Sequence, residues 1–191
     1  MYQRCLKRLL AIVLSALGIA ALSWLMLLLG IAIKLDSPGP VLLRQKRVGR
    51  GKSHFYILKF RTMRTDAPRD IPTHLMDNPH LYITRVGKFL RESSLDELPQ
   101  LFNILLGHMA IVGPRPALWN QFDLIAERDK YGANDIRPGL TGWAQINGRD
   151  KLGISEKARL DGEYVRNLSF ALDVRCFLRT IRVVLCREDI V

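Results

Sequence analysis

One long apolar segment, Leu9–Ile33, contains 25 consecutive residues without a charged side chain. As an α-helix it would be about 37 Å long, which exceeds the roughly 30 Å thickness of a bilayer's hydrocarbon core. A cleavable signal peptide would have a shorter apolar region followed by small residues at a cleavage site. Here the sequence KLDSP follows, at residues 34–38, so we expect the segment to stay in the protein as a membrane anchor.

Basic residues flank the anchor on both sides. They are Arg4, Lys7 and Arg8 before it, and Lys34, Arg44, Lys46, Arg47 and Arg50 after it. Because such residues favour the cytoplasmic side, a re-entrant helix that returns to the same face would keep both flanks inside. A plain span would place a short basic tail outside. Charge alone leaves these two topologies open.

Composition narrows the range of partners. The 29 Lys and Arg against 18 Asp and Glu give a formal net charge of +11, which favours anionic lipids, nucleic acids or phosphorylated substrates. The three cysteines, Cys5, Cys176 and Cys186, form no CxxC pair and are interpreted as reduced thiols in a cytosolic setting. The four histidines lack the spacing of a zinc site.

After the breaker Ser37–Pro40, the sequence predicts a β-hairpin with strands 41–47 and 54–60 joined by the turn 48–53. The polar stretch 65–79, with three prolines, is expected to be a mobile loop, and 81–90 a short strand or helix. Residues 117–130 and 155–167 predict helices, and 136–149 predicts a glycine-rich loop.

Two helices carry more specific expectations. Residues 94–106 predict a helix that begins at Ser94, since Glu97 three residues on completes a capping-box pattern. In 172–187, Arg175, Arg179 and Arg182 fall on one helical face, with apolar residues over much of the rest. Such a basic amphipathic helix favours a membrane interface, although an ordinary surface helix has the same pattern.

The adjacent acids Asp96 and Glu97 are the sharpest candidate for chemistry. Acids in the first turn of a helix also complement its dipole, so the pair alone does not establish catalysis. An ionised Asp can nevertheless attack phosphorus and form an acyl phosphate, and a neighbouring carboxylate can hold Mg²⁺. Four cations are available for phosphate oxygens: Lys59, Arg61, Arg91 and Arg115.

Two further segments favour a phosphate-binding enzyme. In 112–116, the prolines on either side of Arg115 stiffen the turn, which would aim the guanidinium. In 137–149, glycines, amides and Arg137 could approach a sugar nucleotide, with Trp143 as a stacking surface. Each has a plainer interpretation, as a connecting loop and as a core tryptophan.

Four motifs together resemble the bacterial sugar transferases, the monotopic phosphoglycosyl transferases. They are KFRTM at 59–63, SLDELPQ at 94–100, VGPRP at 112–116 and the stretch 137–149. The resemblance runs in order over nearly the whole chain and fits the small, single-domain members. It implies transfer of a phospho-sugar from a UDP-sugar to a polyprenol (undecaprenyl) phosphate with release of UMP, the first membrane step of glycan assembly.

The resemblance also implies residue roles. Asp96 would be the nucleophile of a covalent phospho-sugar intermediate, and Glu97, with Asp96, would bind Mg²⁺. The substrate-binding candidates are Lys59, Arg91, Arg115, Pro116, Arg137 and Trp143. The implied location is the cytoplasmic face of the bacterial inner membrane, among its lipids and without a nucleic-acid partner, and a homodimer is left open.

The expected fold is α+β and mainly α. It consists of a re-entrant membrane helix in residues 1–36 and a cytosolic catalytic domain in 37–191 with a short β-hairpin, a helical core and interfacial amphipathic helices. Two positions depart from the family pattern: Ser23-Trp24 stands where a Ser-Pro pair is typical, and Ala11 where an Asp is frequent. Without the proline, the usual cause of a sharp kink is absent, so a straight span stays open.

Two other functions fit parts of the sequence. A non-catalytic, membrane-bound basic scaffold would bind anionic lipid or nucleic acid with steep salt dependence. An enzyme with the same site could instead hydrolyse a phosphoanhydride. The acidic pair and the Gly-Trp loop favour transfer over the scaffold.

Overall fold

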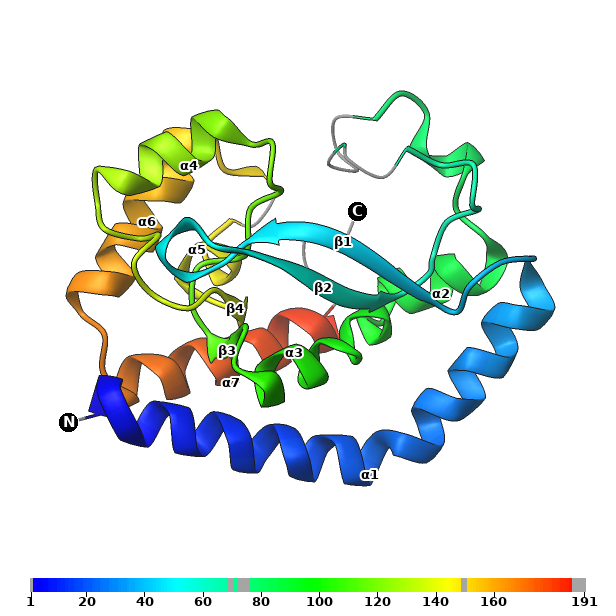
Figure 1. Ribbon diagram of the computed structural model, residues 1–191, viewed down its shortest axis with the longest axis horizontal. Coiled ribbons are helices and arrows are strands. Elements are labelled where there is room, and N and C mark those ends of the chain that lie inside the picture. The colour runs from blue at the N-terminus through cyan, green and yellow to red at the C-terminus, as the bar shows by residue number, and fades with distance from the viewer. Residues whose placement is uncertain (1, 69–70, 72–75, 149–150, 187–191) are drawn as a thin grey trace.

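The computed structural model describes residues 2–68, 71, 76–148 and 151–186. It is mainly helical with two small sheets, as the predicted α+β class requires, and α1 lies along the base of the molecule (Figure 1). The elements are η1 (Tyr2–Leu6), α1 (Lys7–Asp36), β1 (Leu42–Val48), η2 (Arg50–Lys52), β2 (His54–Phe60), η4 (Pro79–Leu81), α2 (Arg85–Glu92), η5 (Leu95–Glu97), α3 (Gln100–Leu106), β3 (Ala110–Val112), α4 (Phe122–Asp129), β4 (Gly139–Thr141), α5 (Trp143–Ile146), α6 (Ile154–Arg166) and α7 (Phe170–Cys186).

Helix α1 contains the predicted anchor and is one continuous helix of 30 residues. It runs along the base and then turns upward through its second half, so the helix is bent (Figure 1). It has no proline, but the Ser23 hydroxyl donates to the Ala20 carbonyl at 3.0 Å, a contact of the kind that often bends helices. Only 11% of its most apolar window is buried inside the protein. Its length, hydropathy and exposure therefore indicate association with a membrane.

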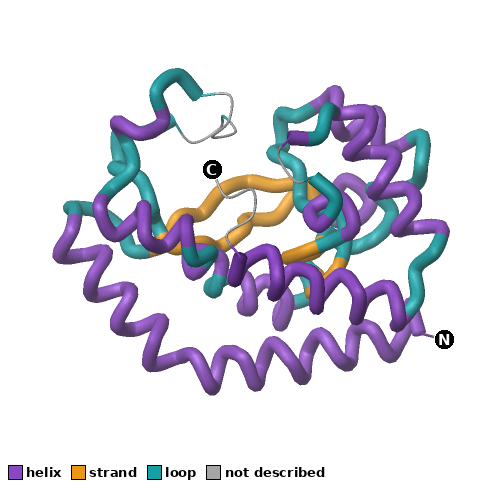
Figure 2. Tube along the Cα trace, turned by 180° about the vertical axis from the view of Figure 1, so that it is seen from behind, coloured by secondary structure: helices purple, strands orange, loops and turns teal. Residues whose placement is uncertain are grey.

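One face of α1 belongs to the protein's own core. Ala11 packs with Phe55 and Ile104, and farther along the helix Leu29 packs with Leu90. These contacts cross the predicted domain boundary between residues 36 and 37. Seen from behind, the strands lie above α1 and among the other helices (Figure 2).

The N-terminal end of α1 is tied to three other helices. The Lys7 ammonium donates to Asp173 of α7 at 2.7 Å and also to the Tyr164 hydroxyl of α6. The Arg8 guanidinium donates to the carbonyls of Ile104 and Leu105, at 2.5 and 2.8 Å. A cation there complements the C-terminal end of the α3 dipole.

The predicted hairpin is confirmed within one residue. Strands β1 and β2 pair antiparallel from Leu42 opposite Phe60 to Val48 opposite His54. Residues directly opposite in such a ladder project from the same face, so the register decides which side chains can meet beneath or above the hairpin.

Residues 94–106 do not form a single α-helix, and the predicted capping box is wrong. Ser94 has a φ of 56° and its side chain makes no capping hydrogen bond. The 3₁₀ turn η5 follows, and α3 begins only after Pro99. Pro99 has no N–H to donate to the Leu95 carbonyl, so a regular helix cannot run through it. The acidic pair therefore sits on a tight turn and not on the first turn of a helix.

A second sheet, which the sequence reading missed, joins β3 to β4 in parallel, with Ala110 opposite Gly139 and Val112 opposite Thr141. The loop prediction for 136–149 is thus wrong for the residues of β4 and α5, and Arg149 lies outside the described residues. A Cβ on Gly113 would lie 2.6 Å from the Arg137 carbonyl oxygen. Only glycine permits this close approach of two backbones.

The predicted helices are confirmed in part. The helices 155–167 and 172–187 correspond to α6 and α7, and the ambiguous 81–90 contains most of α2. The helix expected from residue 117 begins only at Phe122, because Ala117 and Leu118 instead pair with β1. The described residues of 65–78 form turns and bends, and the rest of that loop lies outside the described residues.

Candidate active site

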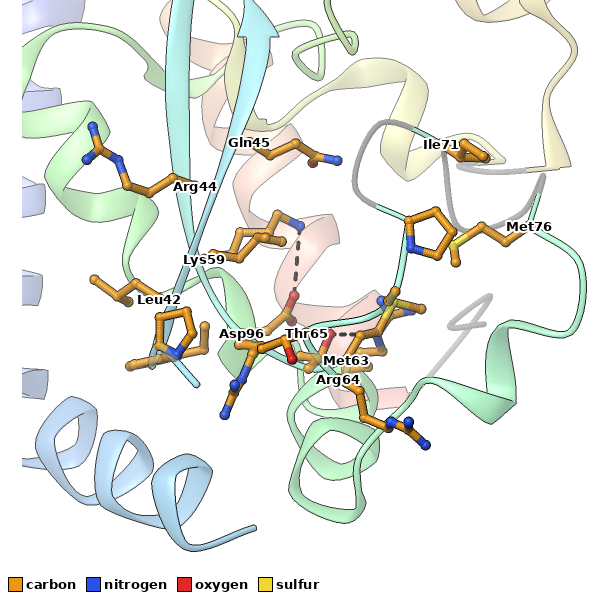
Figure 3. Close-up of a pocket in the computed structure, with 18 of the residues that line it drawn as sticks. Leu42, Arg44, Gln45, Lys59, Met63, Arg64, Thr65, Ile71, Met76 and Asp96 are labelled. Atoms are coloured by element: carbon orange, nitrogen blue, oxygen red, sulfur yellow. Dashed lines mark hydrogen bonds and ion pairs between the residues drawn. The ribbon is translucent and has the colours of Figure 1, made fainter. Parts of the chain in front are cut away.

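A cavity of about 350 Å³ opens between the hairpin and the segment that follows it (Figure 3). Asp96 lies in its wall, and the other charged groups around it are cations: Arg44 and Arg47 of β1, Lys59 of β2, Arg61 and Arg64 of the segment after β2, and Arg91 of α2. The concave shape and the excess of positive charge suit a phosphorylated ligand of modest size.

Glu97 is held by two cations. Its Oε1 accepts hydrogen bonds from Lys59 Nζ at 2.7 Å and from Arg115 Nη2 at 2.6 Å. Burial by itself raises the pKa of Glu97, but the charges and hydrogen bonds of Arg115 and Lys59 outweigh it and hold the pKa well below its ordinary value. Glu97 is therefore ionised at any physiological pH, and it fixes two of the predicted phosphate-binding residues around the turn.

Asp96 is held less tightly than its neighbour. Its Oδ2 lies 3.8 Å from Lys59 Nζ, beyond hydrogen-bond distance, and the two side chains point toward one another in Figure 3. Burial raises the pKa of Asp96, the charge of Lys59 opposes this, and the charge of Glu97 adds to it. The carboxylate is thus mostly desolvated and faces the cavity, and its ion pair with Lys59, at 3.8 Å, is longer than either ion pair of Glu97. These are the properties of a reactive nucleophile.

Arg91 joins this group from α2. Its Nε donates to the Thr62 hydroxyl at 2.9 Å, and burial lowers its pKa against the attraction of Asp96. Thr62 follows directly after β2 and Arg61, whose guanidinium instead binds the Ser37 carbonyl at 2.7 Å at the end of α1. The KFRTM motif therefore has two structural roles. Lys59 and Thr62 bind Glu97 and Arg91 at the site, and Arg61 binds the end of α1.

Arg115 is positioned from behind by a buried ion pair. Arg128 of α4 donates to the Arg115 carbonyl at 2.9 Å and to Asp161 of α6 at 2.8 Å. The stiff turn around Arg115 is thus fixed at its backbone by two helices, while its side chain reaches Glu97. Pro116 contributes its carbonyl, which accepts from Arg47 at 3.0 Å.

Two predicted substrate-binding residues lie away from the acidic pair. Arg137 donates to the Gly107 carbonyl at 3.0 Å, at the opposite end of α3 from Asp96. The Trp143 indole N–H donates to Glu163 at 3.1 Å, and its ring packs in the core cluster around Tyr164. Arg137 therefore caps the C-terminal end of α3, and the position of Trp143 agrees with its plainer interpretation as a core tryptophan.

Arg47 is a site residue that the sequence reading used only as a basic flank. It lines the cavity, donates to Gln45 Oε1 and lies beside Arg115. Burial and the charge of Arg115 lower the pKa of Arg47 to about 9. The strand alternation of the predicted hairpin could have identified Arg47. Gln45 and Arg47 are two residues apart on β1 and lie opposite Ile57 and Phe55 of β2, so they share a face with Lys59.

The acidic pair is also where a divalent cation would fit. The described residues contain no cluster of three or more His, Cys, Asp or Glu side chains that could hold a metal. Mg²⁺ does not require one, because it is commonly bound by one or two carboxylates together with substrate phosphates and water. Asp96 in the cavity wall and Glu97, the next residue along the turn, supply two such carboxylates, and the donor set is all oxygen, which suits that ion.

Comparison with known proteins decides the family. The model of the bacterial sugar transferases matches residues 2–187, nearly the whole chain. The chain belongs to the bacterial sugar transferase family. The resemblance drawn from the four motifs is therefore confirmed, and the motif residues that carry it include the acidic pair and the cations around it.

Among curated relatives of this bacterial sugar transferase, the uncharacterized sugar transferase EpsL of Bacillus subtilis is 38% identical over 185 residues, covering 97% of this chain and 90% of its own length. The UDP-glucose:undecaprenyl-phosphate glucose-1-phosphate transferase of Caulobacter vibrioides is 42% identical over 194 residues, covering 96% and 71%. A protein of the same name from Xanthomonas campestris is 39% identical over 175 residues, covering 88% of this chain. The present transferase spans 36% of that relative's length.

Proposed function

We propose that this bacterial sugar transferase moves a phospho-sugar from a UDP-sugar to a polyprenyl phosphate such as undecaprenyl phosphate, with release of UMP. The observation that carries the proposal is Asp96, a desolvated carboxylate that faces a cationic cavity beside a second carboxylate already bound by two cations. Relatives named as UDP-glucose:undecaprenyl-phosphate glucose-1-phosphate transferases support the same reaction class.

In the first half-reaction, a carboxylate oxygen of Asp96 attacks the phosphorus that carries the sugar. A bond from oxygen to phosphorus forms, the anhydride bond to the second phosphorus breaks, and UMP leaves with the electron pair. The product on the protein is an aspartyl phospho-sugar. Cations around the cavity stabilise the charge that develops on the equatorial and leaving oxygens, which is the main contribution a protein makes to phosphoryl transfer.

In the second half-reaction, a phosphate oxygen of the polyprenyl phosphate attacks the same phosphorus. The acyl-phosphate bond breaks, the Asp96 carboxylate is restored, and a polyprenyl diphosphate sugar is released. No proton needs to move in either step, because attacking and leaving groups are anions. This fits a site with carboxylates and cations but, among its described residues, no histidine in the cavity wall.

The cations have separable roles. Lys59 lies between the two carboxylates, at 2.7 Å from Glu97 and 3.8 Å from Asp96, so it can follow charge as it moves from Asp96 to the phosphoryl group. Arg115 is fixed by Glu97 and Arg128 and presents a planar donor to phosphate oxygens. Arg91 of α2, held by its hydrogen bond to Thr62, supplies a further positive charge to the cavity that Asp96 lines.

Mg²⁺ is part of the proposal. Asp96 and Glu97 would hold it, and the ion would supply charge neutralisation on the diphosphate of the nucleotide sugar. Because burial raises the pKa of Asp96, an additional positive charge beside it would also favour the ionised, nucleophilic form.

The membrane arrangement is the second part of the proposal. The bend of α1 (Figure 1), its exposed apolar surface and its two basic flanks support a re-entrant helix whose ends return to the cytoplasmic face. Asp96 would then lie at the interface, where a water-soluble nucleotide sugar and a lipid phosphate can both reach it.

A nucleotide-release assay tests the reaction. The purified transferase in lipid nanodiscs, with a UDP-sugar panel, undecaprenyl phosphate and Mg²⁺, should release UMP, and Asp96→Asn should abolish it. Asp123→Asn, an exposed acid on α4, is the matched control and should keep full turnover. Near-normal turnover by Asp96→Asn, or release of UDP in place of UMP, would exclude the proposed route. UMP release that continues without a lipid acceptor would indicate hydrolysis, and activity unchanged by a chelator would exclude the metal.

Topology can be tested with a native thiol. Cys5 is exposed and lies just before α1, whereas Cys176 is buried. In a Cys186→Ser background, a membrane-impermeant maleimide should label Cys5 from the cytoplasmic side of inverted vesicles. Labelling only from the periplasmic side would overturn the re-entrant arrangement.

A further inference from the structure

A second cavity of about 350 Å³ lies on the other side of the acidic turn. It is enclosed by η5 and α3 on one side and α7 on the other, with β3 and β4 between them. Its wall is mostly apolar, from Leu98, Leu101, Ile111, Leu140 and Ile181 among others. Its charged lining residues are Glu97 and Arg115.

The two cavities meet at one tight turn. Asp96 lines the cationic cavity, and Glu97, the next residue, lines the apolar one. The guanidinium of Arg115 binds Glu97, and Arg115 lines the apolar cavity but not the cationic one. A molecule in the apolar cavity would therefore meet the guanidinium of Arg115, with Asp96 next in sequence to Glu97 of the same wall.

The part of the apolar cavity's wall that α7 supplies continues into an exposed apolar surface. Phe177 and Ile181 of α7 line the cavity and are still 46% and 43% exposed. On the preceding turns of the same helix, Phe170 and Val174 are exposed too. A chain that begins at Arg115 can thus pass along α7 and leave through a surface that favours a lipid environment.

We propose that this apolar cavity binds the first isoprene units of the polyprenyl phosphate acceptor, with its phosphate on Arg115. The inference rests on the proposed function and assigns the two substrates to separate cavities: the nucleotide sugar to the cationic one and the acceptor to the apolar one. Charge supports this occupant, because the guanidinium of Arg115, which also binds Glu97, is the one cationic group that the described residues place in an otherwise mainly apolar wall, and the acceptor carries one anionic headgroup on an apolar chain. A cavity of about 350 Å³ can hold only a short part of the polyprenyl chain, so the rest of that chain would stay in the bilayer.

A pair of α7 variants tests the assignment. Ile181→Glu places a charge in the cavity wall at a position exposed enough to accept it in the folded protein, whereas Leu178→Glu makes the same change on a side chain that is 59% exposed and does not line the cavity. Measured as a burst of UMP without acceptor, the first half-reaction should stay within twofold of wild type in both. When polyprenyl phosphate is added to the preformed intermediate, Ile181→Glu should raise the half-saturating concentration at least about tenfold, the loss expected for one well-buried apolar contact.

Leu178→Glu should leave that concentration within twofold. Two results would overturn the proposal: acceptor dependence unchanged in Ile181→Glu, or equally impaired in both variants, which would indicate a general effect on membrane binding. A wild-type enzyme that gives no UMP burst would instead refute the proposed function, and a binding measurement then decides the cavity on its own.

That measurement is photolabelling with a diazirine-bearing polyprenyl phosphate, which requires no turnover. Adducts should map to residues that line the cavity, such as Leu140 and Phe177, and excess unlabelled polyprenyl phosphate should suppress them. Suppression by phosphatidylglycerol to the same extent would assign the cavity to ordinary membrane lipid. Adducts confined to α1 would also overturn the proposal.

Discussion

The buried ion pair behind Arg115 gives the sharpest test of the fold's energetics. Arg128 and Asp161 have side chains that are 4% and 1% exposed, and their closest contact, from Nη2 to Oδ2, is 2.6 Å. A second hydrogen bond joins Arg128 Nε to the same carboxylate oxygen at 2.8 Å. The substitution Asp161→Asn keeps the shape of the side chain but removes the charge that compensates the buried guanidinium.

The expected cost follows from this burial. Removing one partner of a buried pair costs about 3–5 kcal/mol, because the other charge is left uncompensated in the interior. For a chain of this size each kcal/mol lowers the melting temperature by about 2–4 °C, so the expected loss is about 6–20 °C. Burial raises the pKa of Asp161 in spite of Arg128, which indicates that the ionised pair is itself costly to bury. A double replacement, Arg128→Met with Asp161→Leu, should therefore recover most of the loss.

Unfolding followed by tryptophan fluorescence in nanodiscs, at several scan rates, measures these differences. Asp123→Asn, exposed on the same helix as Arg128, is the control and should change the melting temperature by less than about 1 °C. A shift below about 2 °C for Asp161→Asn, or a double variant no more stable than the single one, would refute the reasoning.

Three further outcomes are expected. Asp96→Asn should raise the melting temperature at neutral pH while it abolishes transfer. Because the pKa of Asp96 is raised, the folded protein disfavours the ionised carboxylate, and the wild type loses stability as the pH rises through that raised pKa. Thermal scans from pH 4 to 8 should therefore show that the variant's advantage vanishes at the acidic end. Trp143→Phe should lower the melting temperature, because the hydrogen bond from the indole N–H to Glu163 is lost, and should leave the Michaelis constant for the UDP-sugar within twofold. A tenfold rise in that Michaelis constant would instead indicate that Trp143 stacks on the substrate. Arg8→Met should destabilise the protein by about 1–2 kcal/mol, since two carbonyls at the C-terminal end of α3 lose their donor. Lys34→Met, at an exposed position in the last turn of α1, serves as the control.

The local patterns of the sequence predicted the local structures well. Strand alternation gave the hairpin to within a residue, and the spacing in 155–167 and 172–187 gave α6 and α7. The motif residues Lys59, Arg91 and Arg115 were also predicted, and all three lie around the acidic pair.

The errors have two physical causes: Pro99 interrupts the helix expected in 94–106, and elsewhere a distant partner overrides a local preference. Ser94 and Glu97 have the spacing of a capping box, yet Glu97 binds Lys59 from β2 and Arg115 from the turn after β3. Ala117 and Leu118 pair with β1 instead of starting a helix. Such contacts join residues far apart in sequence, so no pattern within one segment can predict them.

For α1 too, the sequence pattern predicts one role and the packing adds another. Hydropathy describes α1 as a membrane anchor, and its exposed surface agrees with that. Packing adds a second role, because Arg8 caps α3, and a Cβ on Gly18 would lie 3.2 Å from Leu101, which lines the apolar cavity. The acidic turn precedes α3 directly, so the helix that meets the lipid also supports the element that carries the site. In this fold α1 and the candidate site are parts of one packed unit, so the proposed position of Asp96 at the bilayer would follow from that packing rather than from the length of a linker.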